Sequence, residues 1–158
     1  MIAADALQKM MTEAFPVSPV PAVLFDARDL NPGGYLPGDV VSTFGGKHWV
    51  DVSLMDWRNS PGAGVVRDYL SVEAFVYYLP SALKASLEDP EFFLIGVECL
   101  LPMNKKREPK GEKWAEFSRA LTAGQRACVV EFLKIGTEGE FADPSVPYES
   151  DIALRLWS

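Results

Sequence analysis

The sequence predicts a mainly α protein (α+β), a single compact helical domain over residues 1–158 with one small β hairpin. Three observations lead to this prediction. A length of 158 residues suits one domain. Apolar residues recur at steps of three and four along several segments, which is typical of amphipathic helices. Residues 39–54 are instead rich in β-branched side chains around two glycines, which is typical of a hairpin.

The N-terminal segment is predicted to be a helix that ends at a proline. Its apolar residues recur at helical spacing, and these are Leu7, Met10, Met11, Ala14 and Phe15. Pro16 ends the helix, because a residue before proline is disfavoured in the helical region. A proline-rich connection then runs to Pro37, with Val23–Phe25 as its candidate strand and Gly33-Gly34 as a turn.

Residues 39–54 allow two interpretations. In the first, residues 39–44 and 49–54 pair as strands across Gly45-Gly46. In the second, residues 39–44 form a short helix that stops at a C-terminal glycine. Residue type favours the hairpin slightly.

The clearest helix start lies at Ser71, whose side chain can cap a helix with Glu73 in its first turn. One apolar residue then follows every four positions, at Phe75, Leu79, Leu83 and Leu87. Pro80 interrupts this run, and its missing N–H predicts a kink or a break.

The C-terminal half contains one ambiguous segment and several clearer ones. Residues 92–101 fit either a helix or a buried strand, since periodicity cannot separate the two. Residues 105–113 hold the only basic cluster, and Pro109 and Gly111 mark it as a solvated loop. The other elements follow in order: a helix over 114–121, a helix from the Thr122–Gln125 capping box, a loop over 137–147 and a helix over 148–157.

Charge and residue usage exclude several classes of protein. The net charge of −7 disfavours non-specific binding to nucleic acid or to an anionic membrane. Asp5 and Lys9 interrupt what would be the apolar core of a signal peptide, so we expect a cytoplasmic protein. Cys99 and Cys128 lack CxxC spacing, and we expect buried free thiols.

Candidate catalytic residues are few. His48 is the single histidine, and Asp51 and Asp56 are its nearest carboxylates in the sequence. An enzyme that uses His48 with these carboxylates is the alternative hypothesis. No catalytic motif supports it, and the cysteines and histidine lack zinc-site spacing, so we expect no catalytic residue, metal or cofactor.

An acidic stretch near the C-terminus is the candidate binding surface. Its six acids are Glu131, Glu138, Glu140, Asp143, Glu149 and Asp151, against one base, Lys134. They form either an ordinary solvated face or an electrostatic docking surface, which would orient a basic partner and speed its association.

Several fragments, in order along most of the chain, resemble a family of small bacterial proteins known only as a domain of unknown function. They are Phe15-Pro16, Gly46–Trp49, Leu70-Ser71, Phe75–Pro80 (FVYYLP), Leu121–Gln125 (LTxxQ) with Phe132-Leu133, and Ala153–Trp157 (ALxxW). The resemblance implies a scaffold of capping, packing and proline positions without catalytic residues. The chain departs from the pattern at Leu156, where we expect an aromatic residue.

Proteins of this size and character are also similar to the immunity partners of bacterial toxins. The resulting hypothesis is a non-enzymatic cytoplasmic protein that occludes the active site of a secreted toxin. Its acidic surface would meet the basic substrate cleft of that toxin, because a toxin that acts on nucleic acid binds a polyanion. The partner is then a cognate basic-cleft toxin or effector protein, with no role for nucleic acid or membrane.

Overall fold

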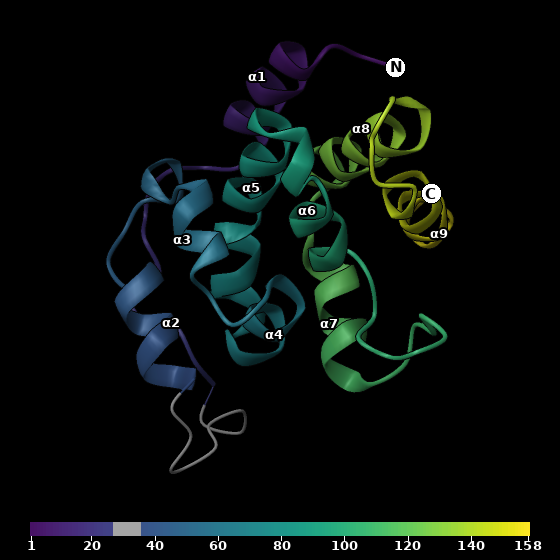
Figure 1. The fold of residues 1–158 in the computed structure, drawn as a ribbon. Coiled ribbons are helices and arrows are strands. Elements are labelled where there is room, and N and C mark those ends of the chain that lie inside the picture. Colours follow the sequence, from purple (N-terminus) through teal and green to yellow (C-terminus); the bar gives the residue numbers. More distant parts are fainter. Residues whose placement is uncertain (27–35) are drawn as a thin grey trace.

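The computed structural model describes residues 1–26 and 36–158, and the predicted turn at Gly33-Gly34 lies outside them. One helix, α5 (Val72–Glu88), runs through the middle of the molecule with other helices around it (Figure 1). The remaining elements are α1 (Ala4–Ala14), α2 (Leu36–Phe44), η2 (Trp49–Asp51), α3 (Leu54–Arg58), α4 (Ala63–Tyr69), η3 (Pro90–Phe92), α6 (Leu94–Cys99), α7 (Glu112–Ala120), α8 (Ala123–Glu138) and α9 (Ser145–Trp157).

The predicted hairpin over residues 39–54 is wrong, and the helical alternative for residues 39–44 is confirmed. Residues 1–26 and 36–158 contain no strand, and Val23–Phe25 is likewise not a strand. α2 ends at Phe44, and Gly46 follows with a φ of +74°. The helix buries Val40 and Phe44, which lie four residues apart on one face. An isolated two-stranded hairpin is at best marginally stable, whereas this helical face packs into the core.

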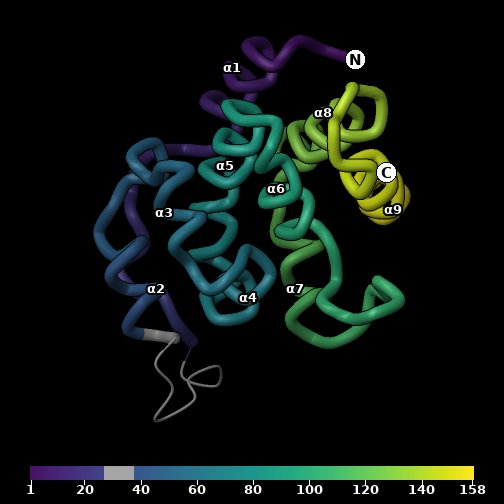
Figure 2. The backbone as a smooth tube through the Cα atoms, in the orientation of Figure 1, coloured from purple at the N-terminus to yellow at the C-terminus, as the bar shows by residue number. Residues whose placement is uncertain are grey.

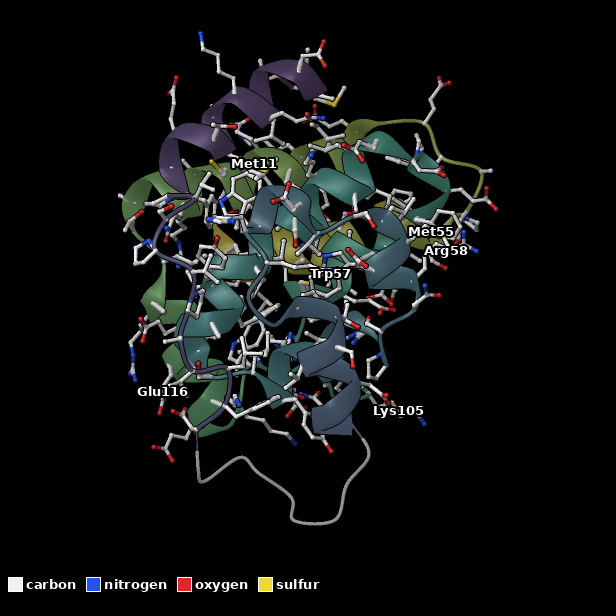
Figure 3. All side chains as sticks on the ribbon, turned by 90° about the vertical axis from the view of Figure 1, so that its left-hand side faces the viewer. Met11, Met55, Trp57, Arg58, Lys105 and Glu116 are labelled. Atoms are coloured by element: carbon white, nitrogen blue, oxygen red, sulfur yellow. The ribbon has the colours of Figure 1, made fainter. Side chains whose placement is uncertain are left out.

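The ring of Phe44 explains why α2 lies where it does. It packs edge-on against Trp57 of α3, with ring centroids 5.0 Å apart, and 5.3 Å from Tyr78 of α5. Trp57 also donates a hydrogen bond from Nε1 to Ser81 Oγ of α5 at 2.9 Å. Figure 3 shows Trp57 toward the middle of the molecule and Met55 and Arg58 toward its edge, in agreement with the burial of Trp57 and the exposure of the other two side chains.

The start of α5 agrees with the sequence, but the proline does not break it. Ser71 Oγ accepts a hydrogen bond from the Ala74 N–H at 3.1 Å, and both Leu70 and Phe75 are buried. α5 is one continuous helix that includes Pro80. Pro80 is itself buried, and packing against α1, α3, α4, α6 and α7 offsets the hydrogen bond that proline cannot form.

Residues 92–101, left open by the sequence, are helical. Asp89 Oδ1 accepts a hydrogen bond from the Glu91 N–H at the start of η3, and α6 follows directly. A loop then leads to α7. The bounds of α7 differ from those of the predicted helix over 114–121 by two residues at the start and one at the end. Figure 2 shows this loop projecting from the body of the molecule before the chain returns at α7.

α8 and α9 form an antiparallel pair with very close packing. The Thr122–Gln125 capping box is confirmed, with Gln125 N–H 3.1 Å from Thr122 Oγ1. α8 extends to Glu138 and α9 begins at Ser145, so the connecting loop is shorter than the predicted 137–147. Gly136 of α8 permits the close approach of the two helices, because a Cβ atom at this position would overlap the hydroxyl of Ser150 in α9.

Candidate functional site

The residues that carry the family resemblance have structural roles. The Tyr77 hydroxyl accepts a hydrogen bond from the Trp49 N–H at 3.1 Å and donates one to the Val17 carbonyl at 2.6 Å. Trp49 Nε1 in turn donates to the Phe15 carbonyl at 3.2 Å. Trp157 Nε1 donates to the Leu100 carbonyl in the same way. These bonds tie the N-terminal connection, η2 and α6 to the core.

His48 lies exposed on the surface directly before η2. Of its neighbouring carboxylates, Asp51 is exposed and Asp56 serves α3 as part of a capping box with Ser53. Burial alone would raise the pKa of Asp56, but the hydrogen bonds from Ser53 and the charge of Lys47, 3.3 Å away, lower it below the usual value. Asp56 is therefore held ionised by structural partners, and an enzymatic role for His48 stays a prediction.

The two thiols are buried, as the sequence predicts. Burial raises the pKa of Cys99 far above its usual range, and the pKa of Cys128 to about 11. The reactive form of cysteine is the thiolate, so we expect both side chains to react slowly in the folded protein. Among residues 1–26 and 36–158 there is no group of three or more histidine, cysteine or carboxylate residues that could hold a metal ion.

The six predicted acidic residues divide into two groups, and the first group has nearby cations. Glu131 lies 3.3 Å from Lys134 Nζ, and Asp151 lies 2.8 Å from Arg155 on the next turn of α9. Glu149 is half-buried, and its Oε2 lies 3.5 Å from Arg107 Nε of the loop before α7. These pairs reduce the charge that α8 and α9 present along their length.

The second group gathers at the end of the helix pair. Glu138 is the last residue of α8, and Glu140 and Asp143 lie in the loop that follows, all three of them exposed. Glu138 also lies 3.8 Å from the N-terminal amine of Met1, at the surface. Exposed pairs of this kind contribute little, about 0–1 kcal/mol, and leave the carboxylate open to other cations.

A hollow of about 380 Å³ lies between this loop and η3. Glu140 and Asp143 line it together with Glu91, a carboxylate that the sequence analysis did not place in the acidic surface. Apolar lining comes from Pro90, Phe141 and Ala142. Only the fold brings Glu91 here, since forty-nine positions separate it from Glu140 in the sequence.

The loop that carries these acids is held to the core. The Phe141 ring lies 4.7 Å from the ring of Phe93, which stacks at 4.5 Å on Phe132 of α8. Asp143 Oδ1 accepts a hydrogen bond from the Ser145 N–H at 2.8 Å. The carboxylates around the hollow thus project from a fixed backbone, which reduces the conformational entropy lost on binding.

Other hollows lie elsewhere among the described residues. One, of about 540 Å³, lies between the proline-rich segment and the start of α5, with Phe15, Val76 and Tyr77 in its walls. Another, of about 390 Å³, lies at the start of α7 beside Arg67. The sequence analysis gave Arg67 no role, because the segment Pro61–Arg67 lacks the third glycine of a GxGxxG phosphate loop.

Comparison with known proteins gives no relative: no protein-family model, no curated protein and no solved structure matches the chain. In the part of the chain that the structure describes, each helix is too short or too polar to cross a lipid bilayer.

Proposed function

We propose that this is a non-enzymatic binding protein that docks a basic protein partner at the loop end of α8 and α9. Its most concrete form is a bacterial immunity protein that acts in the cytoplasm and occludes the active site of a toxin. One observation carries the proposal: exposed carboxylates from two separate segments, Glu91, Glu140 and Asp143, surround a partly apolar hollow on a fixed loop.

The chemistry of this hollow fits the side chain of a lysine or arginine. Such a side chain has an apolar stem and a cationic head, and it packs its stem on apolar surface while the head stays polar. Phe141 and Pro90 offer the apolar surface, and the three carboxylates offer partners for the head. Glu138, at the end of α8 two residues before Glu140, adds negative charge that would steer association more than it adds affinity.

A toxin that acts on nucleic acid supplies a matching surface, because its substrate cleft binds phosphates. A protein of net charge −7 is attracted to such a cleft at long range, and its acidic end would occupy the place of the substrate.

The proposal is tested by charge reversal at the loop end, E138K with E140K and D143K. Tagged protein is used to capture its partner from the native cell, and the affinity of the purified pair is measured at several salt concentrations. We expect the triple variant to lose at least about 100-fold in affinity, which corresponds to ~2.7 kcal/mol, with a weaker salt dependence.

The matched control reverses three exposed acids elsewhere, E13K with D51K and E108K, and so changes the net charge by the same six units. We expect this control to retain affinity within about threefold, since it alters only long-range attraction. Equal losses in both triple variants would show that the loop end is not the docking surface.

A further inference from the structure

The hollow at the start of α7 has a different character from the acidic end of the molecule. It lies between the end of α4, the loop after α6 and the first turn of α7. Its volume of about 390 Å³ is within the range of small-molecule sites. The residues around it offer a buried cation, backbone N–H groups and an apolar wall.

The buried cation is Arg67, whose side chain is only 5% exposed. Its Nε lies 3.4 Å from Asp68 Oδ1, and its Nη1 donates to the carbonyls of Glu98, Cys99 and Leu101 at the end of α6. All of these bonds use Nε and Nη1. Among residues 1–26 and 36–158, Nη2 has no hydrogen-bond acceptor, although Arg67 lines the hollow. A buried guanidinium therefore retains two donors for a ligand.

The backbone N–H groups belong to the first turn of α7. Gly111 precedes the helix with a φ of +96° and has no side chain that could cap it. The first intrahelical bond runs from the Ala115 N–H to the Gly111 carbonyl at 3.1 Å. The N–H groups of Glu112, Lys113 and Trp114 hence precede the helical ladder, at the positive end of the helix dipole. Such a helix start, beside a buried cation, favours an anion.

The charged side chains around the hollow favour the same sign of ligand. Arg67, Lys110 and Lys113 are cationic, and Asp68 and Glu112 are carboxylates, so cations outnumber carboxylates by one in the lining of a hollow in a chain of −7. Lys110 Nζ also lies 3.8 Å from Glu108 Oε2, an exposed pair that screens its charge only weakly. Asp68 is already paired with Arg67, and its backbone carbonyl accepts a hydrogen bond from Lys113 Nζ at 2.6 Å. Local charge dominates at contact distance, because salt screens the rest of the molecule beyond about 8–10 Å.

The remaining wall is apolar. Pro102 and Met103 line it from the loop after α6, and Trp114 from α7. Arg67 lies over the Trp114 ring, with 5.1 Å from the guanidinium carbon to the ring centroid. A bare phosphate ion would leave this wall and most of the volume unused.

We propose that this hollow binds a phosphate monoester with a small organic body. The phosphate would accept hydrogen bonds from Arg67 Nη2 and from the first N–H groups of α7, and the body would lie on Trp114 and Met103. The site is independent of the acidic docking surface, since it uses other elements and the opposite charge.

The test is a titration of the ¹⁵N-labelled protein with phenyl phosphate and with inorganic phosphate, at a constant ionic strength set with sodium chloride. We expect saturable shifts of the Gly111–Trp114 amide signals, with a Kd of about 1 mM or tighter for phenyl phosphate and weaker binding of inorganic phosphate. Absence of saturable shifts, or equal affinity for both ions, would overturn the proposal.

Paired variants separate the hollow from general charge. K110Q with K113Q removes two cations that line the hollow. K105Q with K106Q removes two exposed cations of the loop before α7 that do not line it. Figure 3 shows Lys105 at the periphery. We expect the first pair to weaken phenyl phosphate at least about tenfold and the second less than about twofold. Similar losses in both pairs would mean non-specific attraction and would refute the site, and neither result bears on the acidic surface.

Discussion

Replacing Tyr78 by phenylalanine tests the hydrogen bonds that join α5 to α2. Tyr78 is fully buried, and its hydroxyl lies 2.7 Å from the carbonyl oxygens of both Phe44 and Lys47. Phenylalanine preserves the ring, which lies 5.3 Å from the ring of Phe44 and 4.8 Å from that of Tyr77. The substitution therefore removes one donor and leaves apolar burial almost unchanged.

The expected cost follows mainly from the Lys47 carbonyl, because the Phe44 carbonyl keeps a hydrogen bond from the Lys47 N–H at 3.1 Å. A buried polar group left without a partner costs about 1–3 kcal/mol, so the free energy of unfolding should fall by that amount. For a chain of 158 residues, each kcal/mol lowers Tm by roughly 2–4 °C.

The same side chain gives a signature in the pH dependence. Burial, with a smaller effect of Tyr77, raises the pKa of Tyr78 to about 12 from 10.0. Between these two values the unfolded chain loses a proton that the folded protein retains, so stability falls as pH rises through this window. Tyr78→Phe removes this contribution, and its loss of stability from pH 10 to 12 should be shallower than that of the native chain.

Urea denaturation at pH 7 and at several values from pH 9.5 to 12 measures both effects. Tyr148→Phe is the matched control, because Tyr148 is 67% exposed and its hydroxyl stays in water in either state. A change below about 0.3 kcal/mol for Tyr78→Phe, together with an unchanged slope at high pH, would refute the role of the hydroxyl as a link between the helices.

Three further predictions concern packing, capping and the thiols. Gly136→Ala should lower the free energy of unfolding in urea by about 1–3 kcal/mol, because its Cβ would overlap a serine hydroxyl of α9. The Cβ of Gly38→Ala meets no atom within 4 Å, so this substitution should stabilise α2 by about 0.5–1 kcal/mol. Thr122→Ala removes the cap of α8 and should cost about 1 kcal/mol by the same assay, with no loss if the capping box is unimportant. Cys99 and Cys128 should not react with a thiol reagent at pH 8 until the protein unfolds, and rapid reaction of the native protein would contradict their burial.

Two helix starts were predicted correctly from local signals, whereas the equally local Ser53–Asp56 capping box at the start of α3 was not recognised. Ser71 caps α5 and Thr122 caps α8 as expected, because a capping side chain bonds an N–H only two or three residues away. The continuation of α5 through Pro80 was not predictable in the same way, and the kink or break expected there was not a break. A proline inside a helix loses one hydrogen bond, and whether the helix continues depends on what packs around it.

The helix α4 (Ala63–Tyr69) was missed altogether. The residue before it, Gly62, has a φ of +128° and no side chain to cap the helix, so the usual sequence signal of a helix start is absent. Its stability comes from burial of residues such as Val66 and Arg67, whose partners lie at the end of α6. A local pattern cannot contain those partners.

The candidate site was predictable only in part. The sequence singles out Glu140 and Asp143 by the excess of acids around them, and both line the hollow at the loop end. The sequence gives no reason to add Glu91 to the acidic surface. It also gives no reason to exclude Glu149 from that surface, although Glu149 forms an ion pair with Arg107 in the structure. The proposed role of Glu91, Glu140 and Asp143 in binding a partner stays a prediction.

The sequence by itself determined the net charge, the capped helix starts and the apolar faces, because these depend on composition or on residues within one or two turns. Tertiary structure alone decided that β-branched residues 39–44 form a helix, since the free energy comes from burying Phe44 against Trp57 and Tyr78. It also decided which charges meet at each hollow, because electrostatic interactions depend on distance in space and not on separation along the chain.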